Sequence, residues 1–410
     1  MNGRKSGTRR ALMVTYGGGH VAMIVPVAIE MRRRGWEVQV LALTTAESEM
    51  RKAGLECLTM RNFLRPEDKE ASLWGARLAA GLSQSNTVPY EETVAYMGLS
   101  YADLVAELGE EKAARRYAVE GRQAFRPVGL MRRILAEINP IVVVATNSPR
   151  AERAAIEAAD DLGIPSVCLV DLFALHEIQW IGKPSYAKKI CVMSEYVRQE
   201  FINAGRSQND LVVTGNPAFD RLAGLDSGKN RQEVRRRHAW AAAKVILWVS
   251  QPEPSRHPFS GKTGDPDLPR TIDRHLISLL GKRHDWRLVI RPHPSENLHY
   301  ADLPDRVSLS GRGDDLAELL AGVDCVVVCS STVGLEAALL GRPVVQIQQS
   351  IFSGDAPYAR MGIAVSVENL DNLEAGIEQA LSFPKRPAVA LPAVGTAAAK
   401  VVDVIESVVI

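Results

Sequence analysis

The stretch Cys329–Pro343, CSSTVGLEAALLGRP, decides the fold of this chain. It follows the apolar run Cys325–Val328, so the pattern predicts a strand, a short polar turn and a helix. A strand that leads directly into a helix is the repeating unit of α/β domains with a parallel sheet. The second half of the chain is therefore predicted to contain such a domain.

Ser330, Ser331 and Thr332 occupy the predicted turn, where the helix begins. Backbone N–H groups are free at such a position, and the positive end of the helix dipole favours an anion. Glu336 lies about one helical turn further on, where its carboxylate could accept hydrogen bonds from ribose hydroxyls. These residues indicate a site for a nucleotide diphosphate, although an ordinary N-capped helix has the same pattern.

A second apolar strand, Trp286–His293, ends in two residues that can bind phosphate. Arg291 is a fixed cation, and His293 could donate a charge-assisted hydrogen bond. In open α/β sheets ligands gather at the carboxyl ends of the strands. Both residues are therefore expected to share the donor site with the serine-rich turn.

Two more strands of the second half end in polar residues. Val245–Ser250 leads into SQPEP, which contributes Ser250 and Gln251, and Val344–Ile347 leads into QQS. Four polar strand ends indicate a binding site more strongly than any one of them. Ser250 and Gln251 are therefore added to the expected donor-binding residues.

The turn TYGGGHV, Thr15–Val21, follows the first predicted strand of the chain. Gly17, Gly18 and Gly19 allow a backbone to approach a ligand closely and leave N–H groups free where a helix begins. The spacing is not the GxGxxG dinucleotide fingerprint, and no acidic residue follows the second strand, which ends at Leu43. A phosphate or acceptor loop is predicted here, rather than an NAD(P) site.

His20 ends this glycine run. It could be structural, because a histidine can cap a helix or fill a gap. Its imidazole could instead act as a general base, because it titrates near neutral pH and can take a proton from an attacking hydroxyl. Both interpretations remain open from the sequence.

Four other residues are weaker candidates. Asp171 and His176 follow a predicted strand and could lie at a cleft, although a capping aspartate and a surface histidine are the favoured interpretation. His257 and Asp355 lie on predicted loops at the ligand side of the second half. Asp355, in SGDAPY, could reach a hydroxyl of a donor sugar.

The composition describes a globular enzyme-sized chain. Its 410 residues are 46% apolar and 24% charged, and the net charge of +1 argues against a broad nucleic-acid surface. There is no apolar run long enough to span a membrane. The five cysteines form no CxxC pair and no zinc-like spacing, so we expect free, mostly buried thiols in the cytoplasm and no metal.

Strand-like and helix-like segments alternate through most of the chain, which favours two doubly wound α/β domains. We expect an N-terminal domain over residues 1–225 and a C-terminal domain over residues 240–410. Residues 65–130 break the alternation and are predicted to be a helical insertion. The insertion could shape an acceptor pocket or cover the sheet.

The motifs GGGH, RPHP and SSTxGLEAxLxGRP together resemble the GT-B superfamily of nucleotide-sugar glycosyltransferases. The first half is similar to the N-acetylglucosaminyltransferase group of peptidoglycan synthesis, and the second half to the CDP-glycerol glycerophosphotransferases. The segment Val213–Leu222, VTGNPAFDRL, resembles the UDP-GlcNAc 2-epimerase group. The glycine turn lacks the arginine-glutamate pair of the epimerases.

This resemblance implies two Rossmann-like domains that face a central cleft. It implies that Ser330, Ser331 and Thr332 bind the donor diphosphate, Glu336 the ribose, and Arg291 and His293 phosphate. His20 would be the base of an inverting transfer.

The expected function is therefore metal-independent glycosyl transfer from a nucleotide sugar, with a UDP-sugar as the favoured donor, in surface polysaccharide or glycoconjugate synthesis. The acceptor would be a sugar or a lipid-linked molecule, and the second would bring the chain to the inner face of a membrane. Epimerisation or hydrolysis of the sugar nucleotide is the nearest alternative. A nucleotide-binding protein without turnover is a further one.

Overall fold

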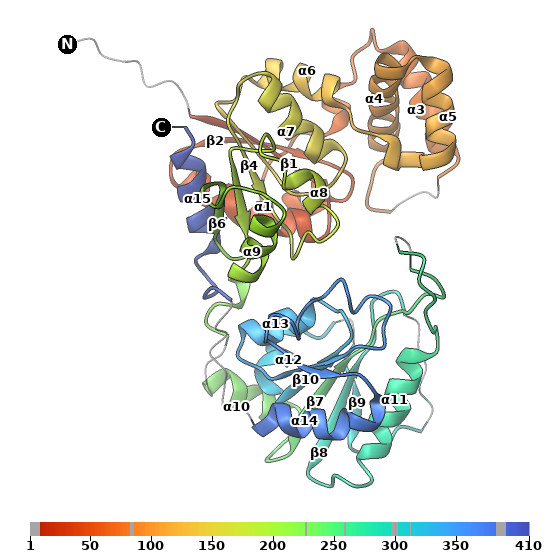
Figure 1. Cartoon of the computed structure of the whole chain (residues 1–410), viewed down its shortest axis with the longest axis vertical. Coiled ribbons are helices and arrows are strands. Elements are labelled where there is room, and N and C mark those ends of the chain that lie inside the picture. The colour runs from red at the N-terminus through yellow and green to blue at the C-terminus, as the bar shows by residue number, and fades with distance from the viewer. Residues whose placement is uncertain are drawn as a thin grey trace, which may run out of the picture. The chain divides into compact units, whose positions relative to one another are not determined.

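The computed structural model describes residues 9–82, 86–225, 228–257, 260–296, 300, 302–311, 313–382 and 391–409. Its contacts divide the chain into two compact units. Unit 1 comprises Met1–Asp220 together with Gly395–Ile410, and unit 2 comprises Arg221–Val394. Both units are α/β, as Figure 1 shows.

Unit 1 contains a six-stranded parallel sheet in the order β2-β1-β3-β4-β5-β6. The strands are β1 (Arg10–Thr15), β2 (Glu37–Ala42), β3 (Val142–Ala145), β4 (Ser166–Leu169), β5 (Lys189–Val192) and β6 (Leu211–Val213). β3 and β4 are buried along their whole length, as expected for strands covered on both faces. The predicted alternation and parallel sheet are confirmed in this half.

Helices connect the strands of unit 1 and cover its sheet (Figure 1). They are α1 (Gly19–Arg33), α2 (Ala46–Lys52), α7 (Ala151–Asp161), α8 (Ile178–Ile181) and α9 (Glu195–Asn203). α1 and α7 each begin just beyond the carboxyl end of a strand. Their first turns therefore carry side chains to the same edge of the sheet.

The segment 65–130 is helical throughout its regular elements, as predicted, although residues 83–85 lie outside the described part. It contains α3 (Lys69–Ala80), α4 (Tyr90–Leu108) and α5 (Glu110–Glu120), and α6 (Val128–Ile138) follows it. α3 and α4 pack closely: a Cβ on Gly75 would lie 2.2 Å from the Val94 carbonyl, and one on Gly98 would lie 2.1 Å from the Ala71 carbonyl. Glycine at both positions permits this backbone contact.

α4, with 19 residues, is the longest helix of the described chain, and it carries two acidic residues in its first turn. Among the residues that the structure describes, no helix combines the length and the apolar character needed to cross a membrane.

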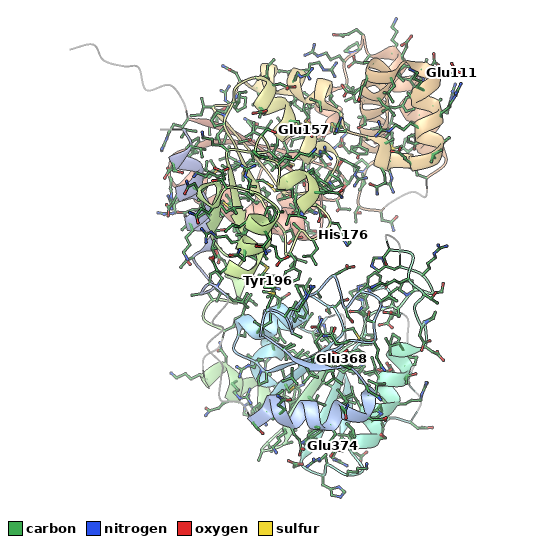
Figure 2. All side chains as sticks on the ribbon, viewed as in Figure 1. Glu111, Glu157, His176, Tyr196, Glu368 and Glu374 are labelled. Atoms are coloured by element: carbon green, nitrogen blue, oxygen red, sulfur yellow. The ribbon has the colours of Figure 1, made fainter. Side chains whose placement is uncertain are left out.

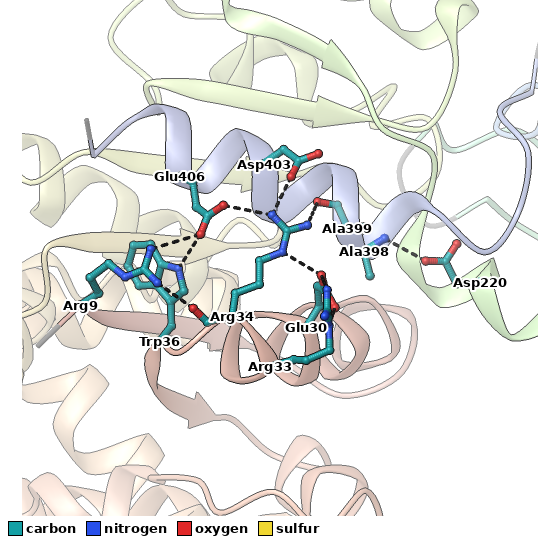
Figure 3. A network of polar contacts seen from close by, with 10 residues as sticks. All are labelled: Arg9, Glu30, Arg33, Arg34, Trp36, Asp220, Ala398, Ala399, Asp403 and Glu406. Carbon is teal, nitrogen blue, oxygen red and sulfur yellow. Dashed lines mark hydrogen bonds and ion pairs between the residues drawn. The ribbon is translucent and has the colours of Figure 1, made fainter.

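The C-terminal helix, α15 (Ala397–Ser407), belongs to unit 1, whereas the sequence placed it in the second domain. Its apolar face, with Val401 and Ile405 fully buried, joins the core of unit 1. Arg34 donates to Asp403 at 2.6 Å and to Glu406 at 3.0 Å (Figure 3). Apolar burial and these ion pairs explain why the expected domain range of 240–410 differs from the structure at its end.

Unit 2 contains a second six-stranded parallel sheet in the order β12-β11-β10-β7-β8-β9. The strands are β7 (Lys244–Val249), β8 (Trp286–Arg291), β9 (Val307–Leu309), β10 (Cys325–Val328), β11 (Val344–Ile347) and β12 (Val365–Val367). The four central strands were predicted from the sequence. β9 and β12, at the two edges, were not, because three residues give too short an apolar pattern.

The helices of unit 2 are α10 (Gly228–Arg237), α11 (Leu268–Leu279), α12 (Leu316–Gly322), α13 (Val333–Leu339) and α14 (Leu373–Ser382). α13 begins directly after the serine-rich turn that follows β10. The predicted strand, turn and helix are therefore present.

Of the five cysteines, all are free thiols and four are buried, as expected.

Candidate functional site

Three strands of unit 1 bring a histidine and two carboxylates to one edge of the sheet. His20 lies in the first turn of α1, which follows β1. Glu152 lies in the first turn of α7, which follows β3, and Asp171 comes shortly after β4. Because β1, β3 and β4 are neighbouring parallel strands, their carboxyl ends share that edge.

A chain of hydrogen bonds orients the His20 ring. The Thr146 hydroxyl donates its single hydrogen to Glu152 Oε2 at 2.5 Å. Its oxygen therefore accepts from His20 Nδ1, which also lies 2.5 Å away. A hydrogen on Nδ1 leaves the lone pair of the neutral ring on Nε2. The side chain of His20 is 27% exposed, so a reactant can reach this ring.

Glu152 is fully buried, and both of its oxygens accept hydrogen bonds. Oε1 accepts from the backbone N–H of Tyr16 at 2.7 Å, and Oε2 accepts from that of Ser148 at 2.7 Å as well as from Thr146. Oε2 also lies 3.5 Å from His20 Nδ1. These donors compensate the carboxylate for its loss of water, and the charge can stabilise an imidazolium.

Asp171 is the second carboxylate near His20. Burial raises the pKa of Asp171, while the charge of His20 and a hydrogen bond from Asn216 lower it by less. That bond runs from Asn216 Nδ2 to Asp171 Oδ1 at 3.3 Å, and the Asp171 N–H donates to Asn147 Oδ1 at 2.7 Å. Asp171, only a weak candidate from the sequence, therefore belongs to the His20 cluster.

The glycine turn before His20 packs tightly against both neighbouring loops. A Cβ on Gly17 would lie 1.7 Å from Thr45 Oγ1, and one on Gly19 would lie 2.6 Å from Asp171 Oδ2. Gly18 has φ 71° and precedes the first residue of α1. Glycine is therefore required here by protein contacts and by a left-handed backbone. A role for Gly17, Gly18 and Gly19 as a phosphate or acceptor loop stays a prediction.

In unit 2, Gln251 and Ser330 form hydrogen bonds between the ends of two neighbouring strands, β7 and β10. Gln251 Oε1 accepts from the Ser330 N–H at 3.0 Å, and Gln251 Nε2 donates to Ser330 Oγ at 2.9 Å. The Ser330 N–H, which the sequence predicted to be free, is thus occupied by a side chain. The pair fixes the loop after β7 against the loop after β10.

The next two N–H groups of the turn, those of Ser331 and Thr332, have no acceptor in the described part of the protein. The Tyr358 hydroxyl donates to the Ser331 carbonyl at 2.9 Å and so fixes the backbone of the turn. The Thr332 side chain is exposed. Two adjacent, accessible N–H groups at a helix start can bind an oxyanion.

Glu336, one turn into α13, is 6% exposed and forms an ion pair with Arg221. Burial raises the pKa of Glu336, and the charges of Arg221 and Arg291 lower it by less. The sequence did not predict the Arg221 partner, which lies 115 positions away. The carboxylate can accept hydroxyl donors only if Arg221 shares it or moves.

Arg291 and His293 extend from the end of β8. Arg291 Nη1 donates to Ser310 Oγ at 2.8 Å, and the guanidinium has no carboxylate partner in the described part of unit 2. The Ser295 N–H donates to His293 Nδ1 at 3.1 Å, so the neutral ring carries its hydrogen on Nε2. The exposed His293 can therefore donate from Nε2, as phosphate binding requires.

Ser250 is 1% exposed and its hydroxyl lies within a polar network. It accepts from Arg270 Nη2 at 2.7 Å and donates to Glu296 Oε1 at 3.3 Å. Glu296 Oε2 in turn accepts from the His293 N–H at 2.8 Å. These contacts give Ser250 a structural role in fixing the loop after β8, and the ligand contact expected from the sequence stays a prediction.

The three remaining candidates lie on loops. His257 Nε2 is 3.0 Å from Asp355 Oδ2, and because the Ser260 N–H donates to Nδ1, the neutral His257 ring donates to Asp355. The structure thus brings together two residues that the sequence left separate. His176 is exposed before α8 (Figure 2).

Comparison with protein-family models and with curated sequences gives no match. Solved structures do match. The UDP-GlcNAc 2-epimerase of Neisseria meningitidis, solved with UDP-GlcNAc, is 14% identical and covers 97% of this chain and 100% of its own, with a TM-score of 0.60. The calicheamicin glycosyltransferase CalG4 is 15% identical and covers 98% of both chains, with a TM-score of 0.57.

A third match, the glycotransferase of kitacinnamycin, is 15% identical and covers 98% of this chain and 100% of its own, with a TM-score of 0.58. The chain has the GT-B fold. At these identities the likeness establishes the fold alone, and both kinds of enzyme share it. The activity must therefore be argued from the residues that this GT-B chain places at its strand ends.

Sequence reasoning missed Thr146 and Glu152, the two residues that orient His20. The signal was present: the polar residues of TNS directly follow the apolar strand that ends at Ala145, and a glutamate opens the next helix. Such a pattern usually indicates a helix cap. Only the parallel pairing of β1 with β3 brings it to His20.

Proposed function

We propose that this GT-B protein is an inverting glycosyltransferase. It would move a sugar from a UDP-sugar to a hydroxyl group of a sugar or lipid-linked acceptor, in the synthesis of a surface polysaccharide or glycoconjugate. The observation that carries the proposal is the hydrogen-bond chain from His20 through Thr146 to the buried Glu152.

These hydrogen bonds support a role for His20 as a general base. Nε2 of His20 would take the proton of the acceptor hydroxyl as its oxygen attacks the anomeric carbon of the donor sugar. The bond to the nucleoside diphosphate breaks as the new glycosidic bond forms, so one displacement inverts the anomeric centre. The negative charge of Glu152, whose Oε2 lies 3.5 Å from His20 Nδ1, would stabilise the imidazolium that results.

Unit 2 would bind the donor. The N–H groups of Ser331 and Thr332 are suited to the diphosphate oxygens, with Arg291 and the Nε2–H of His293 as further donors. These fixed positive groups could neutralise the departing diphosphate without a metal ion. Glu336 would accept the ribose hydroxyls, with Arg221 moving or sharing its carboxylate.

A second candidate function, 2-epimerisation of the sugar nucleotide, is favoured by Asp171. Epimerisation requires proton removal from carbon and proton return, and so benefits from two acid–base groups in one place. Asp171, whose pKa is raised by burial, lies close enough to His20 for their charges to interact. The Neisseria meningitidis enzyme with the same fold is an epimerase.

The test begins with thermal unfolding in the presence of UDP-, GDP-, CDP- and TDP-sugars, followed by incubation of the stabilising donor with and without acceptor hydroxyls. We expect stabilisation by a UDP-sugar, slow donor loss alone, and a product of inverted anomeric configuration by ¹H NMR when an acceptor is added. A second sugar nucleotide formed without acceptor would establish epimerisation instead. Binding with no product under either condition would contradict both activities.

A further inference from the structure

Unit 1 contains a cavity of about 560 Å³ between its helical insertion and the strand ends of its sheet. Tyr16, Thr45 and Arg150 line it from the sheet side, and Tyr96 and Arg122 line it from the insertion. The volume is within the range of small-molecule sites. The proposed function assigns no ligand to this cavity.

Arg150 lines the cavity and has no carboxylate partner among the described residues. Its guanidinium lies 4.7 Å from the centre of the Tyr16 ring, but it makes no hydrogen bond or ion pair within the described chain. It is partly buried, and partly buried charges are usually paired. The charge of Glu152 acts on Arg150, but no hydrogen bond or ion pair joins the two side chains in the described chain. Up to five N–H donors of Arg150 are therefore available to a ligand.

The other charges of the cavity favour an anion as well. Arg122 is exposed and has no carboxylate partner in the described residues. Glu92, the one acid among the described lining residues, is 1% exposed. Its oxygens accept from the N–H groups of Met60 and Arg61 at 3.1 Å each, so it already has its partners.

The remainder of the cavity suits an apolar or ring-shaped body. The hydroxyls of Tyr16 and Tyr96 are 2.8 Å apart and their rings meet edge to face, with centres 6.2 Å apart. Leu82 and Met97 add apolar surface from the insertion. Aromatic rings next to an unpaired arginine can contact such a body while the guanidinium binds its charge.

We propose that this cavity binds a small molecule that carries a carboxylate or a phosphate, with Arg150 as the ligand of the anion and Arg122 as a second cation. Its role rests on the proposed function: the molecule would be the acceptor, held by its charge while His20 activates its hydroxyl. One carboxylate connects the cavity to His20. Glu152 accepts from the N–H of Tyr16, a residue of the cavity wall, and from the Thr146 hydroxyl that orients His20.

The test uses the full chain and titrates phenyl phosphate, benzoate and neutral benzyl alcohol by ligand-observed NMR. We expect both anions to bind and benzyl alcohol to bind at least 10-fold more weakly. Arg150→Ala should weaken the anions about 10-fold or more, Arg150→Lys by less, and Arg122→Ala a few-fold. Arg115→Ala is the matched control, because Arg115 pairs with Glu111 on α5 and neither residue lines the cavity.

Equal affinities for the anions and benzyl alcohol, or full anion binding in Arg150→Ala, would overturn the proposal. So would loss of phenyl phosphate in Arg291→Ala rather than in Arg150→Ala, since the probe would then occupy unit 2. If Arg150→Ala fails to fold, Arg150→Lys and the exposed Arg122 decide the result. UDP binding, measured separately, distinguishes failure of the cavity from failure of the proposed donor site.

Discussion

The two sheets of this protein are alike, but their strand ends carry different chemistry. In unit 1 they surround one imidazole with two carboxylates, and Glu152 is held as a buried anion by backbone N–H groups. In unit 2 they present N–H groups, a guanidinium and a histidine, and the acid Glu336 is paired with Arg221. One edge is suited to moving a proton and the other to holding an anion.

Under the proposed function, this difference would divide one reaction between the two sheets. The strands and turns place polar groups at the carboxyl ends in both units, as doubly wound sheets do. The identity of those groups then decides what each edge can do. The first three variants below should affect the function of one edge and leave that of the other intact, and the fourth should affect stability.

His20→Asn should have the largest effect. It removes the base but keeps a polar side chain, so turnover should fall about 10²-fold or more while donor affinity changes little. Rates at saturating donor and calorimetric titration with UDP measure the two quantities separately. His284→Ala, an exposed histidine near the start of β8, is the control. An unchanged rate in His20→Asn would remove the proton-transfer role of unit 1.

Glu336→Gln should lower the affinity for the nucleotide, which His20→Asn should leave almost unchanged. The amide keeps the shape but loses the charge that ribose hydroxyls would contact, so UDP affinity should fall about 10-fold or more, as for a lost hydrogen bond to a charged group. Glu318→Gln, which breaks a surface pair with Arg237, should leave it unchanged. Unaltered UDP affinity in Glu336→Gln would exclude the ribose contact.

Thr146→Val tests whether the hydrogen bonds between His20, Thr146 and Glu152 contribute to turnover. It keeps the volume but removes the hydroxyl between His20 and Glu152, so turnover should fall several-fold, as for one neutral hydrogen bond. The pH–rate profile should also shift, because the imidazolium loses its link to the carboxylate. Thr146→Ser should restore both. A lower rate with an unchanged pH profile would mean that Thr146 acts only through packing.

Asp171→Asn should have the smallest effect, on stability. The folded-state pKa of Asp171 is raised above its ordinary value of 3.8, so its favourable contribution is complete below that value and is lost as the pH rises through the folded-state pKa. The variant should therefore be more stable than the parent at pH 7 and should lose this advantage near pH 4.

Thermal unfolding across this pH range measures the difference. Asp285→Asn is the control of opposite sign, because a hydrogen bond from Lys244 lowers the pKa of Asp285. A constant gap between parent and Asp171→Asn at all pH values would show that burial does not raise the pKa of Asp171.

The sequence was sufficient for the architecture and for single strand ends. Apolar runs such as Cys325–Val328 and the turns after them predict parallel strands and helix starts, because both depend on local patterns. The edge strand β9 was missed since its three residues carry almost no pattern. The placement of α15 on unit 1 was missed because it depends on partners such as Arg34, hundreds of positions away.

The site was predicted one residue at a time, and its internal contacts were not. His20 and Ser330 were identified from their turns, but the partners that define them, Thr146 and Gln251, come from other strands. Ser250 shows the reverse case, since it lies at a strand end yet is covered by Arg270 and Glu296. Sequence position predicts which edge a residue reaches, and packing decides whether it is accessible.

The most direct test of the division between the units is hydrogen–deuterium exchange of the full chain with saturating UDP. The account predicts the largest protection in peptides that cover residues 329–336 and 291–296, at the strand ends of unit 2. Protection confined to residues 15–22, with none at 329–336, would place the nucleotide at the His20 edge and contradict the account.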